Sequence, residues 1–193
     1  MKKILYWSSI LSLTLLFASC SSSKKTVKST PVTPGEIEVT IPLGDPEYQS
    51  NAEYWRAVQT GTSKDMSMAK KVAMQNARQE LAATVQHQVK TVIENYGQNA
   101  AMGANNENEA LYQEMARTVI NQQMNGVELI GEKLFRLEDG SYRYHVCLQM
   151  SREALGTDLS DALSNDDRLK LEFDKAQFKK VFDEEMARFA ERK

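Results

Sequence analysis

The stretch Val127–Met150, VELIGEKLFRLEDGSYRYHVCLQM, decides the fold that the sequence predicts. Two runs with strand character flank Asp139-Gly140, a dipeptide typical of tight hairpin turns. The second run alternates between two faces, one made of Tyr142, Tyr144, Val146, Leu148 and Met150 and the other of Arg143, His145, Cys147 and Gln149. A period of two residues predicts a β-hairpin with one buried face.

A third strand and a long helix are expected ahead of this hairpin. Tyr54–Thr60, YWRAVQT, has strand character, and 61–63 then form a turn that caps a helix running from about 64 to 96. At about 100° per residue, one helix face gathers Met66, Ala73, Met74, Ala77, Leu81, Val85, Val89, Val92 and Tyr96. Alanines 69, 73 and 77 would allow close approach to a sheet.

A second helix is expected over 109–124, after a loop rich in glycine and asparagine at 97–108. Asn125-Gly126 is typical of a helix C-terminus. The predicted fold class is therefore α+β, with a three-stranded antiparallel sheet packed on a long helix plus a second helix. This domain is expected to span 49–152.

Residues 153–193 are predicted to form an amphipathic helical C-terminal extension. Its segment 167–192 carries an apolar stripe of Leu171, Phe178, Val181, Phe182 and Phe189, with charged residues on the opposite side. The stripe either packs on the domain or binds a partner. In the second case Phe178, Phe182 and Phe189 are the candidate binding residues, and self-association of the helix is a further alternative.

The N-terminus has the pattern of an export signal. Lys2 and Lys3 precede an apolar run over 4–18, which is shorter than the roughly 20 residues that span a bilayer. Small residues Ala18 and Ser19 then lead directly to Cys20. This order resembles the bacterial lipobox, with Phe17 in place of the more common leucine. The resemblance implies removal of 1–19 and acylation of Cys20, which would anchor the mature chain to a membrane.

Residues 20–48 are expected to form a flexible tether, because they hold all four prolines and many hydroxyl residues. A short edge strand is an alternative prediction here, because Ile37, Val39 and Ile41 alternate with polar residues. Ser21–Lys25 contains no acidic residue. In similar lipoproteins acidic residues after the cysteine accompany surface display, so an outer-membrane anchor facing the periplasm is expected.

The strand, the Gly61-Thr62 turn, the alanine-spaced helix and the hairpin together resemble the LPP-twenty lipoprotein family. Its domain is similar to the N-terminal domain of the flagellar assembly protein FlgT. The likeness covers about 54–150 and implies an α+β domain held in a bacterial envelope. It implies no catalytic residue.

The residues themselves give little sign of chemistry. Neither His87 nor His145 has a neighbour at metal-ligand spacing, so no metal or cofactor is expected. His145 and Cys147 share a strand face, and an unrecognised enzyme site at this pair is the alternative to a structural thiol.

Of the 24 basic residues two lie within 1–19, which leaves 22 against 26 acidic ones and a charge of about −4. That balance argues against a nucleic-acid partner. The sequence therefore predicts a non-enzymatic envelope lipoprotein that acts as a binding or assembly module.

Overall fold

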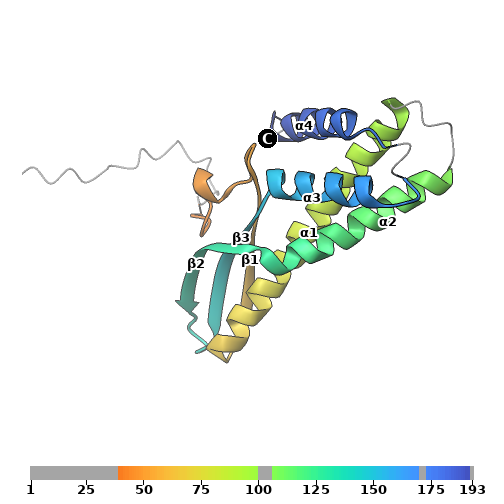
Figure 1. The fold of residues 1–193 in the computed structure, drawn as a ribbon. Coiled ribbons are helices and arrows are strands. Elements are labelled where there is room, and N and C mark those ends of the chain that lie inside the picture. The colour runs from red at the N-terminus through yellow and green to blue at the C-terminus, as the bar shows by residue number, and fades with distance from the viewer. Residues whose placement is uncertain (1–38, 100–105, 170–172, 192–193) are drawn as a thin grey trace, which may run out of the picture. The chain divides into compact units, whose positions relative to one another are not determined.

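The computed structural model describes residues 39–99, 106–169 and 173–191. The chain divides into two compact units, Met1–Val39 and Thr40–Lys193, and the elements below all belong to the second. They are η1 (Pro46–Tyr48), β1 (Tyr54–Ser63), α1 (Met66–Asn99), α2 (Asn106–Gln123), η2 (Met124–Gly126), β2 (Glu128–Arg136), β3 (Tyr142–Ser151), α3 (Arg152–Asn165) and α4 (Lys175–Glu191) (Figure 1).

The predicted α+β class is confirmed. The three strands form one antiparallel sheet in the order β1-β3-β2, so the hairpin pairs with the Tyr54 strand through β3. Strand β1 is longer than expected, because Gly61, Thr62 and Ser63 continue its pairing with β3 instead of forming a turn. The helix cap also lies later than predicted, since Asp65 Oδ1 accepts a hydrogen bond from the Met68 N–H at 2.7 Å.

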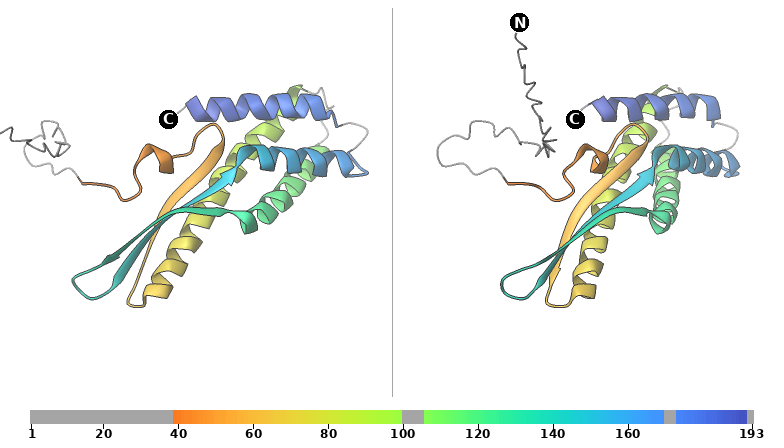
Figure 2. Two further views of the ribbon diagram at one scale, coloured as in Figure 1. Left: turned by 60° about the vertical axis from the view of Figure 1, so that its left-hand side comes forward. Right: turned by 90° about the vertical axis from the view of Figure 1, so that its left-hand side faces the viewer.

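Helix α1 lies along one face of the sheet (Figure 2). Its buried residues are Ala69, Ala73, Ala77, Leu81, Val85, Val89, Val92, Ile93 and Tyr96, which is most of the predicted apolar face. Met66 is an exception, because at the first position of the helix its side chain is 48% exposed. The alanines bring β1 so close that a Cβ on Gly61 would lie 2.4 Å from both Ala69 O and Ala73 N. The sequence therefore sets the helix–sheet distance with small residues on both sides.

Part of the other face of the sheet, around Cys147, is covered as well, although a single buried face was expected. Cys147 is fully buried there, and its Sγ donates to the Tyr48 carbonyl at 3.6 Å. A Cβ on Gly131 would lie 2.5 Å from Tyr48 Cε1, so this ring lies directly on β2. The end of the predicted tether thus packs on the sheet, and Thr40 begins the folded unit.

A tight turn brings this covering segment into place. Gly44 N–H donates to Ile41 O at 3.1 Å, and Leu43 between them has a φ of 56°. A left-handed leucine costs on the order of 1–2 kcal/mol, and burial of its side chain to 1% exposure offsets that cost. No strand forms at 39–41, and Ile37 lies outside the described residues.

The C-terminal helices share the core of the domain. Helix α3 follows β3 without a loop. The last residue of β3, Ser151, is also the N-cap of α3, because its Oγ accepts a hydrogen bond from the Ala154 N–H at 3.2 Å. Residues of both helices belong to the same buried cluster as α1, namely Leu155, Leu159, Leu163, Phe178, Val181, Phe182 and Met186.

The apolar stripe of the last helix therefore packs on the domain, which is the first of the two alternatives. Phe178 is 1% and Phe182 is 4% exposed, and Phe189 packs partly buried against the same cluster. Leu171 lies outside the described residues. Phe178 and Phe182 are accordingly core residues of the described structure, whereas Phe189 is only partly covered. Among the described residues, no helix combines the length and hydropathy needed to cross a membrane.

Candidate functional site

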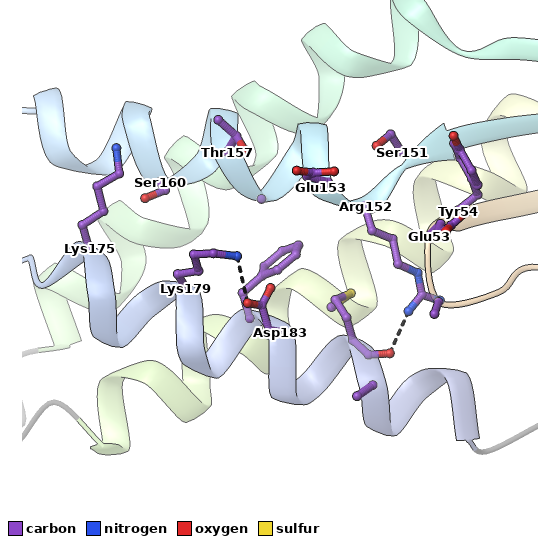
Figure 3. A pocket seen from close by; sticks show the side chains of 15 residues that line it. Glu53, Tyr54, Ser151, Arg152, Glu153, Thr157, Ser160, Lys175, Lys179 and Asp183 are labelled. Carbon is purple, nitrogen blue, oxygen red and sulfur yellow. Dashed lines mark hydrogen bonds and ion pairs between the residues drawn. The ribbon is translucent and has the colours of Figure 1, made fainter.

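A cleft of about 710 Å³ lies between α3 and α4. Its walls come from the start of β1, from one face of α3 and from the facing side of α4, which runs beside α3 (Figure 3). Phe182 and Met186 supply apolar surface, and Arg152, Lys175 and Lys179 supply charge. A volume in this range is typical of small-molecule sites.

Arg152 is the distinctive group of this cleft. Its side chain is 4% exposed, its guanidinium carbon lies 5.2 Å from the centre of the Trp55 ring, and Nη1 donates to the Met186 carbonyl at 2.7 Å. Nε is buried and has no hydrogen-bond partner within the described ranges. Burial lowers the pKa of the guanidinium, with no contribution from a neighbouring carboxylate. A buried cation without a counter-ion carries a large desolvation cost.

The other cations of the cleft already have partners at its rim. Lys175 pairs with Asp161 at 2.7 Å. Lys179 pairs with Asp183 at 2.8 Å (Figure 3). Both pairs are exposed and so contribute little to stability. Glu153 and Glu53 add two further acids to the lining.

Gly156 shapes the middle of the cleft. A Cβ at this position would lie 2.8 Å from Phe182 Cε1, so the ring packs directly on the backbone of α3. Ser160 lies one turn further along, 5% exposed, and its Oγ has no hydrogen-bond partner in the described part of the chain. The cleft therefore combines an apolar centre with two buried polar groups.

The pair that sequence analysis singled out lies elsewhere, on the sheet face under η1. Burial raises the pKa of the Cys147 thiol to about 11, against a weaker lowering by Arg56. Burial together with Arg143 and Lys133 lowers the pKa of His145. The thiol is therefore protonated at neutral pH, whereas a nucleophilic cysteine needs a lowered pKa. This environment counts against an enzyme site at His145 and Cys147.

The raised pKa predicts a stability change at high pH. The pKa of Cys147 in the folded protein lies above the ordinary value of 9.0. The contribution of the thiol to the free energy of unfolding is therefore complete below pH 9 and is lost as the pH rises through about 11. In a Cys20→Ala background we expect this loss to reach about 3 kcal/mol, because the shift is about two pKa units at about 1.4 kcal/mol each. Urea unfolding at pH 8 to 11 measures it. Because tyrosines also ionise near pH 10, a Cys147→Ala variant is the control. An equal loss of unfolding free energy with pH in the two proteins would contradict the expectation.

The other candidate site residues from the sequence either lie on separate elements or lie outside the described residues. His87 is exposed on α1, while His145 lies on the sheet. No group of three or more His, Cys, Asp or Glu side chains that could hold a metal occurs in the described ranges. Cys20 lies outside those ranges, so its acylation stays a prediction.

Sequence reasoning missed Arg152 and Ser160. An arginine at the junction of a strand and a helix is ordinarily a surface residue. Nothing local in the sequence shows that Trp55 and α4 will bury it.

Comparison of the chain with protein families, with curated proteins and with solved structures finds no match. The fold and the cleft by themselves define the class of protein: an α+β domain with a buried arginine between two helices. The likeness to the LPP-twenty family stays a prediction from the sequence.

Proposed function

We propose that this chain is a bacterial envelope lipoprotein, anchored through acylated Cys20, whose folded unit is a non-enzymatic binding or assembly module in the periplasm. The observation that carries the proposal is the short apolar run that ends in Ala18-Ser19-Cys20 after a basic start. The following Ser21–Lys25, which lacks acids, favours the periplasmic face of the outer membrane.

Acylation would make the attachment effectively permanent. Each buried methylene contributes about 0.8 kcal/mol, and a single chain binds only reversibly, whereas two or three chains do not dissociate on a useful timescale. The segment between Cys20 and Thr40 would then give the folded unit reach from the membrane. A module of this kind meets its partners at the surface of the bilayer.

The partner is proposed to be another envelope protein, with self-association as the second arrangement. Because α4 is part of the core, self-association through its apolar stripe would require the domain to open. A surface contact of the intact domain is therefore the simpler route to an assembly.

In-cell crosslinking followed by mass spectrometry tests this function. We expect a discrete crosslinked partner with the parent protein and its loss with Cys20→Ala, because the unanchored domain would leave the membrane surface. Cys147→Ala is the matched control, since it removes the other cysteine and should keep the partner. A crosslinking pattern that is unchanged in Cys20→Ala would contradict an anchored module.

A further inference from the structure

We propose that the cleft between α3 and α4 binds a small monocarboxylate with an apolar tail, and that its carboxylate pairs with Arg152. This inference goes beyond the proposed function, because such binding needs neither the lipid anchor nor a protein partner. It rests on three features of the cleft: a buried cation that has no counter-ion among the described residues, a rim whose acids disfavour higher negative charge, and an apolar centre of suitable size.

The buried guanidinium is the first feature. Nη1 is held by the Met186 carbonyl, while Nε has no partner in the described part of the chain. An incoming carboxylate would supply both the missing hydrogen bond and the missing charge, and a planar carboxylate matches the fork of an arginine. Arg152 is also the first residue of α3, and the N-terminus of a helix adds favourable partial positive charge for an anion.

The charges at the rim limit the ligand to a single negative charge. Glu53, Glu153 and Asp183 line the cleft, and they would repel a dianion such as a phosphate monoester. Lys179 already pairs with Asp183, and Lys175 with Asp161 outside the lining. Among the cations that line the cleft, Arg152 is therefore the one without an ion pair within the described residues, and a single carboxylate can pair with it.

The apolar centre accounts for the tail. Phe182, packed on Gly156, and Met186 lie on the α4 side, and both line the cleft. Arg152 and Ser160 are eight positions apart on α3, which is roughly 12 Å along the helix at about 1.5 Å per residue. A chain of about eight carbons fits this length, and about 710 Å³ is a small-molecule volume. Burial of such a tail provides the binding energy, and the arginine selects the charged group.

Trp55 provides a direct readout of binding. Its ring faces the Arg152 guanidinium at 5.2 Å, and Trp7 is the one other tryptophan of the chain. In the full chain carrying Trp7→Phe, titration with sodium octanoate should change the fluorescence saturably. Octan-1-ol has the same tail without the charge, and acetate has the charge without the tail, so each should need at least a tenfold higher concentration. Equal responses to octanoate and octanol would overturn the proposal without any variant.

Arg152→Met tests the proposed contact. It keeps an apolar stem and removes the charge, and we expect octanoate binding to weaken by at least tenfold, as for loss of a charged hydrogen bond. Its melting temperature without ligand should be unchanged or higher, because a buried unpaired charge is removed. Arg117→Met, at an exposed position on α2, is the matched control and should bind octanoate within about twofold of the parent. Binding of octanoate to Arg152→Met within twofold of the parent would refute the role of Arg152. None of these outcomes depends on Cys20, so a failure here is distinct from a failure of the anchor.

Discussion

Replacing Gly61 with alanine is expected to lower the free energy of unfolding by about 3 kcal/mol, the upper end of the range for overpacked cores. The added Cβ would lie 2.4 Å from Ala69 O and from Ala73 N, and 2.9 Å from the Val72 Cβ. Two of these three atoms belong to the backbone of α1, so no side-chain rotation can make room. Strand and helix must separate, and the buried alanines between them lose their contacts.

Urea unfolding monitored by circular dichroism measures this effect. Gly97→Ala is the matched control, because a Cβ on Gly97 of α1 meets nothing within 4 Å. That change should stabilise the helix by up to about 1 kcal/mol. If Gly61→Ala unfolds within about 0.5 kcal/mol of the parent, the close approach of β1 to α1 is contradicted.

Phe178→Ala is expected to cost about 3–5 kcal/mol, the usual range for a buried phenylalanine. The Phe178 ring is 1% exposed and lies 5.5 Å from Tyr96 and 5.4 Å from Phe173 between ring centres. Its removal would leave a cavity where α4 meets α1, and the surrounding rings cannot all collapse into it.

Phe135→Ala is the control for this substitution, since Phe135 on β2 is 43% exposed. We expect it to cost about 1 kcal/mol or less, as for most surface positions. Denaturant midpoints of the two variants provide the comparison. Equal costs would mean that α4 does not pack on the domain and that its apolar stripe is open to a partner after all.

The sheet and the long helix were predictable because their patterns are local. Alternation from Tyr142 to Met150 and the Asp139-Gly140 turn specify a hairpin, and the spacing of Ala69, Ala73 and Ala77 specifies a helix face that meets a flat surface. Packing of one helix on one sheet is enough to bury these residues, so their burial can be predicted without knowing the rest of the tertiary structure.

The covering segment before β1 could not be predicted in the same way. Its prolines and hydroxyl residues are typical of a linker, and the packing depends on Leu43, on the Tyr48 ring and on the absence of a side chain at Gly131. Contacts between a single ring and a distant glycine leave no periodic signal in a sequence.

The last helix shows a different limit. Its period predicts an apolar face, but a period does not say which surface covers that face. The cleft follows from this docking, because α4 supplies Met186 and Phe182 to a site whose arginine lies on α3. A site built between two helices could therefore not be predicted before their packing was known.

The mass of the intact protein purified from membranes tests the central claim, that Cys20 anchors this domain, most directly. We expect the mass of a chain that begins at Cys20, increased by a diacylglyceryl group and a further acyl chain. Cys20→Ala should lack that increase, while Cys147→Ala should retain it. A chain that keeps residues 1–19, or one cut before Cys20 without added lipid, would contradict the anchor and with it the proposed place of this protein in the envelope.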